Sequence, residues 1–66
     1  MPRMFVEQKC PASESPRAAV SRLMHELDIA AAGAGQRVVG DVTIMEYESP
    51  LEITRHLRLE ADVTPA

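Results

Sequence analysis

Residues 51–63, LEITRHLRLEADV, alternate between apolar and polar side chains along almost their whole length. Arg55 is the exception, because it stands where the alternation calls for an apolar residue. Successive side chains of a β-strand point to opposite faces, so a period of two predicts a strand with one face in the core. The apolar face of this strand carries Leu51, Ile53, Leu57, Leu59, Ala61 and Val63.

A helix is predicted between residues 16 and 32. Ser15 can accept a hydrogen bond from a backbone N–H of the first turn, and Pro16 suits that turn because it lacks the N–H. Gly33 and Gly35 supply the stop. Ile29 falls on the side opposite the apolar stripe, where Arg22 and Glu26 are predicted to form an i, i+4 ion pair. The stripe follows the spacing i, i+3, i+4, i+7 and consists of Val20, Leu23, Met24, Leu27 and Ala31.

Two further strands are predicted at residues 3–9 and 37–48, and Pro50 fits a turn between the second strand and the last one. The sequence therefore predicts an α+β fold: one small domain, residues 1–66, in the order β-α-β-β. Its long C-terminal antiparallel hairpin is expected to pack on one helix. The strand residues that should meet the helix stripe are Val38, Val42, Ile44, Leu57 and Leu59.

The predicted register of the hairpin follows from a four-residue turn that pairs Tyr47 with Glu52. This register sets Ile44 opposite Arg55, and it places Glu46 diagonal to Arg55 on the core-side face, within reach of long side chains. Arg55 is thus expected to pack its alkyl stem on the sheet and to bind Glu46. The other predicted pairs are Val38 with Ala61, Val42 with Leu57, Asp41 with Arg58, and Thr43 with His56.

The small size of the chain predicts assembly. A 66-residue chain buries only about 60% of the surface that it exposes when unfolded. Cys10 is the only cysteine, so an internal disulfide is excluded. Thirteen strand residues would span about 43 Å, against about 28 Å for a compact domain of this length. Three features would accommodate a strand longer than its domain: a strong twist, a bulge near Gly40, or a neighbouring subunit. The neighbouring subunit is the favoured solution, in a dimer or a larger ring. The interface candidates are Ile29, Met45, Tyr47, Leu51, Ile53 and Arg55.

Charge is uneven along the chain and bears on the partners. Residues 41–66 carry two arginines against six acidic residues. Nucleic-acid binding normally needs clustered Lys and Arg, so no nucleic acid is expected, and a protein with a basic surface fits better. The longest uncharged run, residues 29–36, is too short to span a membrane, and no membrane partner is expected. The lone cysteine and the lack of an export signal predict a cytoplasmic protein.

Residues that could catalyse a reaction or bind a metal are few and scattered along the sequence. His25 and Asp28 are spaced i, i+3 as two metal ligands could be, but no third ligand follows. His56 lies on the polar face of the last strand, and Cys10 precedes Pro11 at a strand end. We therefore expect no catalytic residue, no metal and no cofactor. The sequence predicts a non-enzymatic homo-oligomeric interaction protein, an adaptor or inhibitor that acts through its surface.

Two family resemblances give the alternative functions. The β-α-β-β order, the chain length and the pair Ser15–Pro16 at the helix start are similar to dodecins, which implies a hollow oligomer that binds flavin. Dodecins stack the flavin on a tryptophan at the start of the second strand, where this chain has Arg37 and Val38. An initial strand followed by a helix also resembles the tautomerase superfamily, which implies an enzyme whose base is an N-terminal proline. Pro2 would take that place if Met1 were removed.

Overall fold

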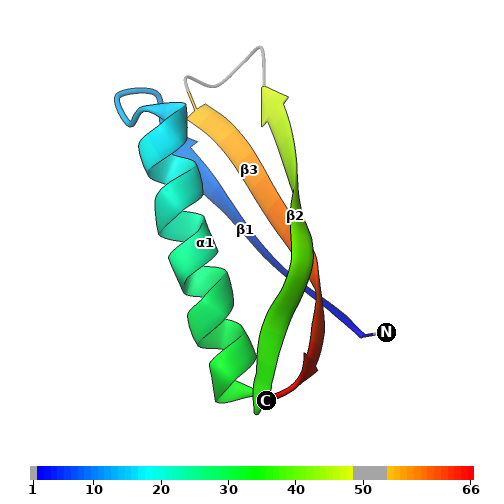
Figure 1. Cartoon of the computed structure of the whole chain (residues 1–66). Coiled ribbons are helices and arrows are strands. Elements are labelled where there is room, and N and C mark those ends of the chain that lie inside the picture. Colours follow the sequence, from blue (N-terminus) through cyan, green and yellow to red (C-terminus); the bar gives the residue numbers. More distant parts are fainter. Residues whose placement is uncertain (1, 49–53) are drawn as a thin grey trace.

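The computed structural model describes residues 2–48 and 54–66, which form one helix packed on a three-stranded antiparallel sheet (Figure 1). The elements in chain order are β1 (Arg3–Pro11), α1 (Pro16–Gly33), β2 (Gln36–Glu48) and β3 (Thr54–Pro65). The strand order in the sheet is β1-β3-β2, so the C-terminal strand is central and the other two are edges. The predicted α+β class and the β-α-β-β order are confirmed. Leu51 and Ile53, predicted as the start of the last strand, and the predicted turn at Pro50 lie outside the described residues.

The ends of α1 follow the local sequence. Ser15 is the N-cap, and its Oγ accepts a hydrogen bond of 3.2 Å from the backbone N–H of Ala18. Pro16 occupies the first helical position, where its missing N–H costs nothing. The helix ends at Gly33, and Gly35 has a φ of 72°, a conformation that glycine adopts without strain. Both predicted helix signals are thus confirmed.

The buried ridge of α1 differs from the predicted stripe. Residues four apart form it, namely Ala19, Leu23, Leu27 and Ala31. Val20 is half-buried, while Met24 is 42% exposed. The prediction for Met24 was therefore wrong. The ridge that faces the sheet is narrow, and its two alanines allow close approach, so a residue 100° away from Leu23 falls on the flank.

The core is formed between this ridge and the central strand. Four alternating residues of β3 are at most 1% exposed: Leu57, Leu59, Ala61 and Val63. Cys10 of β1 joins them, and Val38 and Val42 of β2 pack against the cluster from the side. Ile44 was also predicted to pack there, but it is 49% exposed. The reason is that β2 is an edge strand, and its second half runs away from the helix (Figure 1).

The register of β2 and β3 differs from the predicted one. Val38 pairs with Val63, Ile44 with Leu59 and Tyr47 with His56. The predicted partners Ala61, Arg55 and Glu52 are therefore wrong by two, four and four residues, respectively. The predicted pairs Val42–Leu57, Asp41–Arg58 and Thr43–His56 are also not formed. The change of offset along the hairpin comes from a bulge between Val39 and Thr43, where Gly40 has a φ of 73°. Because both shifts are even, they leave the paired side chains on their predicted faces.

The molecule is elongated, with principal extents of 40 × 18 × 17 Å. The long strands therefore fit within one chain through this shape and through the bulge at Gly40, which was one of the solutions predicted. Strand length by itself no longer requires a neighbouring subunit. Oligomerisation stays a prediction, and it must now rest on the surfaces that α1 leaves uncovered.

Truncation of Leu57 to alanine should destabilise the fold by about 2–5 kcal/mol, because a fully buried leucine leaves a cavity. The matched control is Ile29→Ala, since Ile29 is 58% exposed and should change the free energy of unfolding by less than about 0.5 kcal/mol. Urea unfolding measures both. Equal midpoints for Leu57→Ala and the parent would contradict the placement of Leu57 in the core.

Candidate interaction surface

The face of the sheet opposite α1 is open. Leu57 and Leu59 point to the helix, so His56, Arg58 and Glu60 of β3 point to the other side. The register places neighbours from the edge strands beside them. Three rows result on this outer face: Phe5–Glu60–Thr43, Glu7–Arg58–Met45, and Lys9–His56–Tyr47.

A ladder of ion pairs joins β1 to β3 across the outer face. Arg58 donates to Glu7 at 3.1 Å and to Glu60 at 3.0 Å. Nε2 of His56 also contacts Oε1 of Glu7. Arg3 binds Glu60 at 3.1 Å and Asp62 at 3.4 Å. Charge on this face is therefore largely neutralised within the chain.

These contacts shift the acid–base equilibria of the ladder. The hydrogen bond with His56, together with Arg58, lowers the pKa of Glu7 below its usual value of 4.5. The hydrogen bond from Arg58, helped by the positive charge of Arg3, lowers the pKa of Glu60. The same bond with Glu60 raises the pKa of Arg58. Each shift favours the charged form that the ladder uses.

Aromatic side chains lie at both sides of the outer face. Phe5 is 52% exposed, and the guanidinium carbon of Arg58 lies 3.8 Å from the centre of its ring. Tyr47 is also 52% exposed; its ring meets His56 edge-on, and its hydroxyl donates to the sulfur of Met45 at 3.6 Å. The predicted interface residues Met45 and Tyr47 are thus in contact. Phe5 is not among the predicted interface residues, although the alternation along residues 3–9 places it on the face opposite Met4 and Val6.

The other predicted interface residues lie elsewhere. Ile29 is exposed on α1. Arg55 shares the core-side face with Leu57, and its Nε lies 2.5 Å from a carboxylate oxygen of Glu46. Glu46 is opposite Leu57, hence diagonal to Arg55, so the predicted ion pair is confirmed although the register differs. Leu51 and Ile53 lie outside the described residues. Within one chain, the described members of the predicted set do not form one continuous patch.

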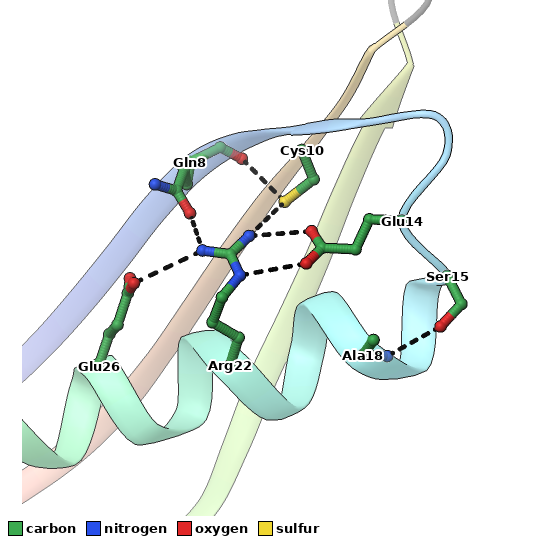
Figure 2. A network of polar contacts seen from close by, with 7 residues as sticks. All are labelled: Gln8, Cys10, Glu14, Ser15, Ala18, Arg22 and Glu26. Carbon is green, nitrogen blue, oxygen red and sulfur yellow. Dashed lines mark hydrogen bonds and ion pairs between the residues drawn. The ribbon is translucent and has the colours of Figure 1, made fainter.

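A second polar cluster ties α1 to β1 and to the connector between them (Figure 2). Arg22 donates from Nε and Nη2 to the two carboxylate oxygens of Glu14, at 3.2 and 2.9 Å. Its Nη1 reaches Gln8 on β1 and, at 3.5 Å, Glu26 one turn further along the helix. The predicted pair of Arg22 with Glu26 is confirmed, at a distance of 3.5 Å. The bidentate pair with Glu14 lowers the pKa of Glu14 and raises the pKa of Arg22.

Cys10 completes the Arg22 cluster on the β1 side (Figure 2). Its sulfur accepts from Nη2 of Arg22 at 3.5 Å and donates weakly to the carbonyl oxygen of Gln8 at 3.9 Å. The side chain is 1% exposed and belongs to the core. A nucleophilic thiol has to reach its substrate, so the geometry suits a structural role.

Within residues 2–48 and 54–66, no three residues among His, Cys, Asp and Glu come together as a metal site would require. The helix in this part of the chain is too short or too polar to cross a membrane.

Comparisons of the chain with family models, with curated proteins and with solved structures find no match.

Acidification should destabilise the protein below about pH 4.5, the usual pKa of a glutamate side chain. Glu7, Glu14 and Glu60 have lowered pKa values in the fold. Groups of this kind contribute stability above the unfolded-state pKa, and the contribution disappears as the pH falls through the folded-state value. Melting temperatures across acidic pH measure the effect. A triple variant with glutamine at these positions should show a weaker dependence, and an equal dependence would contradict the assignment.

Replacement of Arg22 by glutamine should loosen the junction of β1 with α1 and expose Cys10. The expected result is a lower melting temperature and faster modification of Cys10 by a thiol reagent, because the connector loses its bond through Glu14. Arg17→Gln on the same helix is the control, since Arg17 is exposed. Equal modification rates for the two variants would show that the Arg22 cluster does not shield the thiol.

Proposed function

We propose that this chain is a non-enzymatic interaction protein, an adaptor or inhibitor, that acts through its surface as a homo-oligomer in the cytoplasm. The observation that carries the proposal is the amount of apolar side chain that the fold leaves uncovered. Among the described residues, the large apolar groups that are 42–58% exposed are Phe5, Met24, Ile29, Ile44 and Tyr47.

The uncovered groups follow from the architecture. A three-stranded sheet has two faces and two edges, and α1 covers one face only (Figure 1). Scattered single apolar residues are normal on protein surfaces. Here, however, the second half of the edge strand β2 carries Ile44 on the helix-side face and Met45 and Tyr47 on the outer face. Ile44 and Tyr47 are about half exposed, and an edge strand also presents backbone groups that can pair with another chain. Self-association would compensate for the small core of such a short chain.

A second partner is a protein with a basic surface, as the acidic excess in residues 41–66 suggests. The contacts reduce this excess, because Glu46, Glu60 and Asp62 each bind an arginine of the same chain. Self-association is therefore the better supported half of the proposal.

The mass in solution tests the proposal directly. Light scattering of the purified chain at micromolar concentration should give a multiple of 7.2 kDa, together with a folded circular-dichroism spectrum. A well-folded sample with a mass near 7.2 kDa would contradict the homo-oligomer.

A dodecin-like ligand store is the second candidate. The β-α-β-β order and the cap formed by Ser15 before Pro16 are both present in the structure, and they are the features on which that resemblance rests. Such a protein would purify with bound flavin. Flavin absorbance in the native sample would favour this candidate, and a colourless sample that takes up no added flavin would exclude it.

The tautomerase alternative depends on the residue before Pro2. Pro2 is exposed at the start of β1, and its carbonyl oxygen accepts a 3.0 Å hydrogen bond from the N–H of Val63. A catalytic proline needs a free secondary amine, which exists only if Met1 is removed. The intact mass of the native protein decides this point, because retained Met1 excludes the enzyme.

A further inference from the structure

A bulge interrupts β2 close to its middle. Between the regular pairs on either side of it, β3 contains only Ala61. β2 contains three residues there, namely Gly40, Asp41 and Val42. Val42 packs against the core cluster, as Val38 does, whereas Gly40 and Asp41 are exposed. These two are therefore the surplus residues, and without them Val42 would stand opposite Ala61 in an unbroken ladder.

Gly40 gives the bulge its shape. Its φ of 73° lies in the left-handed region, which residues with a side chain rarely adopt. A Cβ atom added at this position would meet no atom of the described residues within 4 Å, its chain neighbours apart. Glycine is therefore required here for the bend of the backbone and not for lack of space. Asp41 follows the bend and places a carboxylate on the surface of the strand.

The residues on both sides of the bulge favour strands and carry no charge. Residues 38–39 are two valines, and residues 42–45 are Val, Thr, Ile and Met. Joined without the surplus pair they would read VVVTIM, six consecutive residues without a charge, a proline or a glycine. Segments of this length and composition are the ones that stack into cross-β assemblies. Gly40 and Asp41 interrupt such a segment.

The interrupted segment lies on an exposed edge. β2 is an edge strand, so one row of its backbone N–H and C=O groups has no partner among the described strands. In β1 and β3 the uncharged runs are at most three residues long. The run after Asp41 in β2 is four residues long, and it would be six without the surplus pair. β2 is therefore the strand in which an interruption matters most.

We infer that Gly40 and Asp41 are a gatekeeper pair, which interrupts the edge strand β2 and prevents open-ended strand pairing between copies of this chain. The bend acts through shape, because a bulge twists the edge away from a flat partner. Asp41 acts through charge. In an in-register stack its carboxylate would lie about 4.7 Å from that of the next copy, and like charges at that spacing repel.

The gatekeeper role goes beyond the proposed homo-oligomer and does not depend on it. A homo-oligomer is an association of a fixed number of copies, whereas the gatekeeper pair limits growth without end. The mass of the wild-type chain decides the first, and the change of mass on removal of the pair decides the second.

Deletion of Gly40 and Asp41 together tests the inference. The shortened chain can keep all regular pairs of β2 with β3, and because two residues are removed every side chain stays on its face. We expect a protein that is folded by circular dichroism and whose mass in light scattering grows with time beyond the wild-type mass. Thioflavin fluorescence should rise in parallel. A folded variant that keeps the wild-type mass would overturn the inference.

A lysine on the shortened strand is the rescue control. Thr43 is exposed and opposite Glu60, so Thr43→Lys returns a charge to the edge without entering the core. In the shortened chain this substitution should stop the growth of the assemblies. Growth at an unchanged rate would show that β2 is not the growing edge, and would also overturn the inference.

Asp41→Val decides the case in which the shortened chain does not fold. This substitution keeps the chain length and the bend at Gly40 and removes only the charge. Asp28→Val is the matched control, because Asp28 is exposed on α1 and the chemical change is the same. Under agitation, Asp41→Val should shorten the lag time of thioflavin-monitored assembly relative to Asp28→Val. Equal lag times for the two variants would contradict the gatekeeper role of Asp41.

Discussion

The packing of one helical ridge on one strand is the contact on which the rest of the structure depends. Ala19, Leu23 and Leu27 of α1 form one buried cluster with Leu57, Leu59 and Ala61 of β3, and all six are at most 1% exposed. β3 is central in the sheet, so this contact also fixes the two edge strands through backbone hydrogen bonds. The same contact sets the limit of the fold. A ridge of this width covers the central strand and leaves the second half of β2 and the whole outer face to solvent.

Polar contacts fix β1, which contributes little to the buried core. β1 contributes Cys10 to the fully buried set, while Met4 and Val6 are half-buried. On the outer face, Glu7 joins β1 to β3 through Arg58 and His56. On the helix side, Arg22 joins β1 to α1 through Gln8 and to the connector through Glu14. Exposed ion pairs contribute little individually, but these two clusters lie on opposite faces of β1 and restrain it from both sides.

The sequence predicted which sheet face each strand residue occupies better than it predicted the cross-strand partners. Alternation identified the buried residues of β3 and placed Tyr47 and Met45 outward, because a side-chain period of two survives any even slip of register. The register itself was wrong because it was built on a four-residue turn that pairs Tyr47 with Glu52, whereas Tyr47 pairs with His56. The bulge at Gly40, which the pattern does not show, then reduces the error from four residues to two. The predicted Arg55–Glu46 pair was nevertheless found, because a diagonal contact is available in both registers.

Two features of the candidate surface could not be read from the pattern. Ile44 is apolar and on the core-side face, and only the strand order β1-β3-β2 shows that it lies at an edge beyond the helix. Arg22 was predicted to pair with Glu26 from their spacing, whereas its bidentate partner Glu14 comes from the connector, whose path depends on how β1 meets α1. Both depend on tertiary arrangement rather than on local periodicity.

The central claim is that association buries the apolar surface that α1 leaves uncovered. Unfolding that includes dissociation makes the melting temperature depend on protein concentration, whereas unfolding of a monomer does not. Thermal melts of the wild-type chain from nanomolar to high micromolar concentration measure this dependence. A melting temperature that rises with concentration is the predicted result. A single cooperative transition at one constant temperature would contradict the claim.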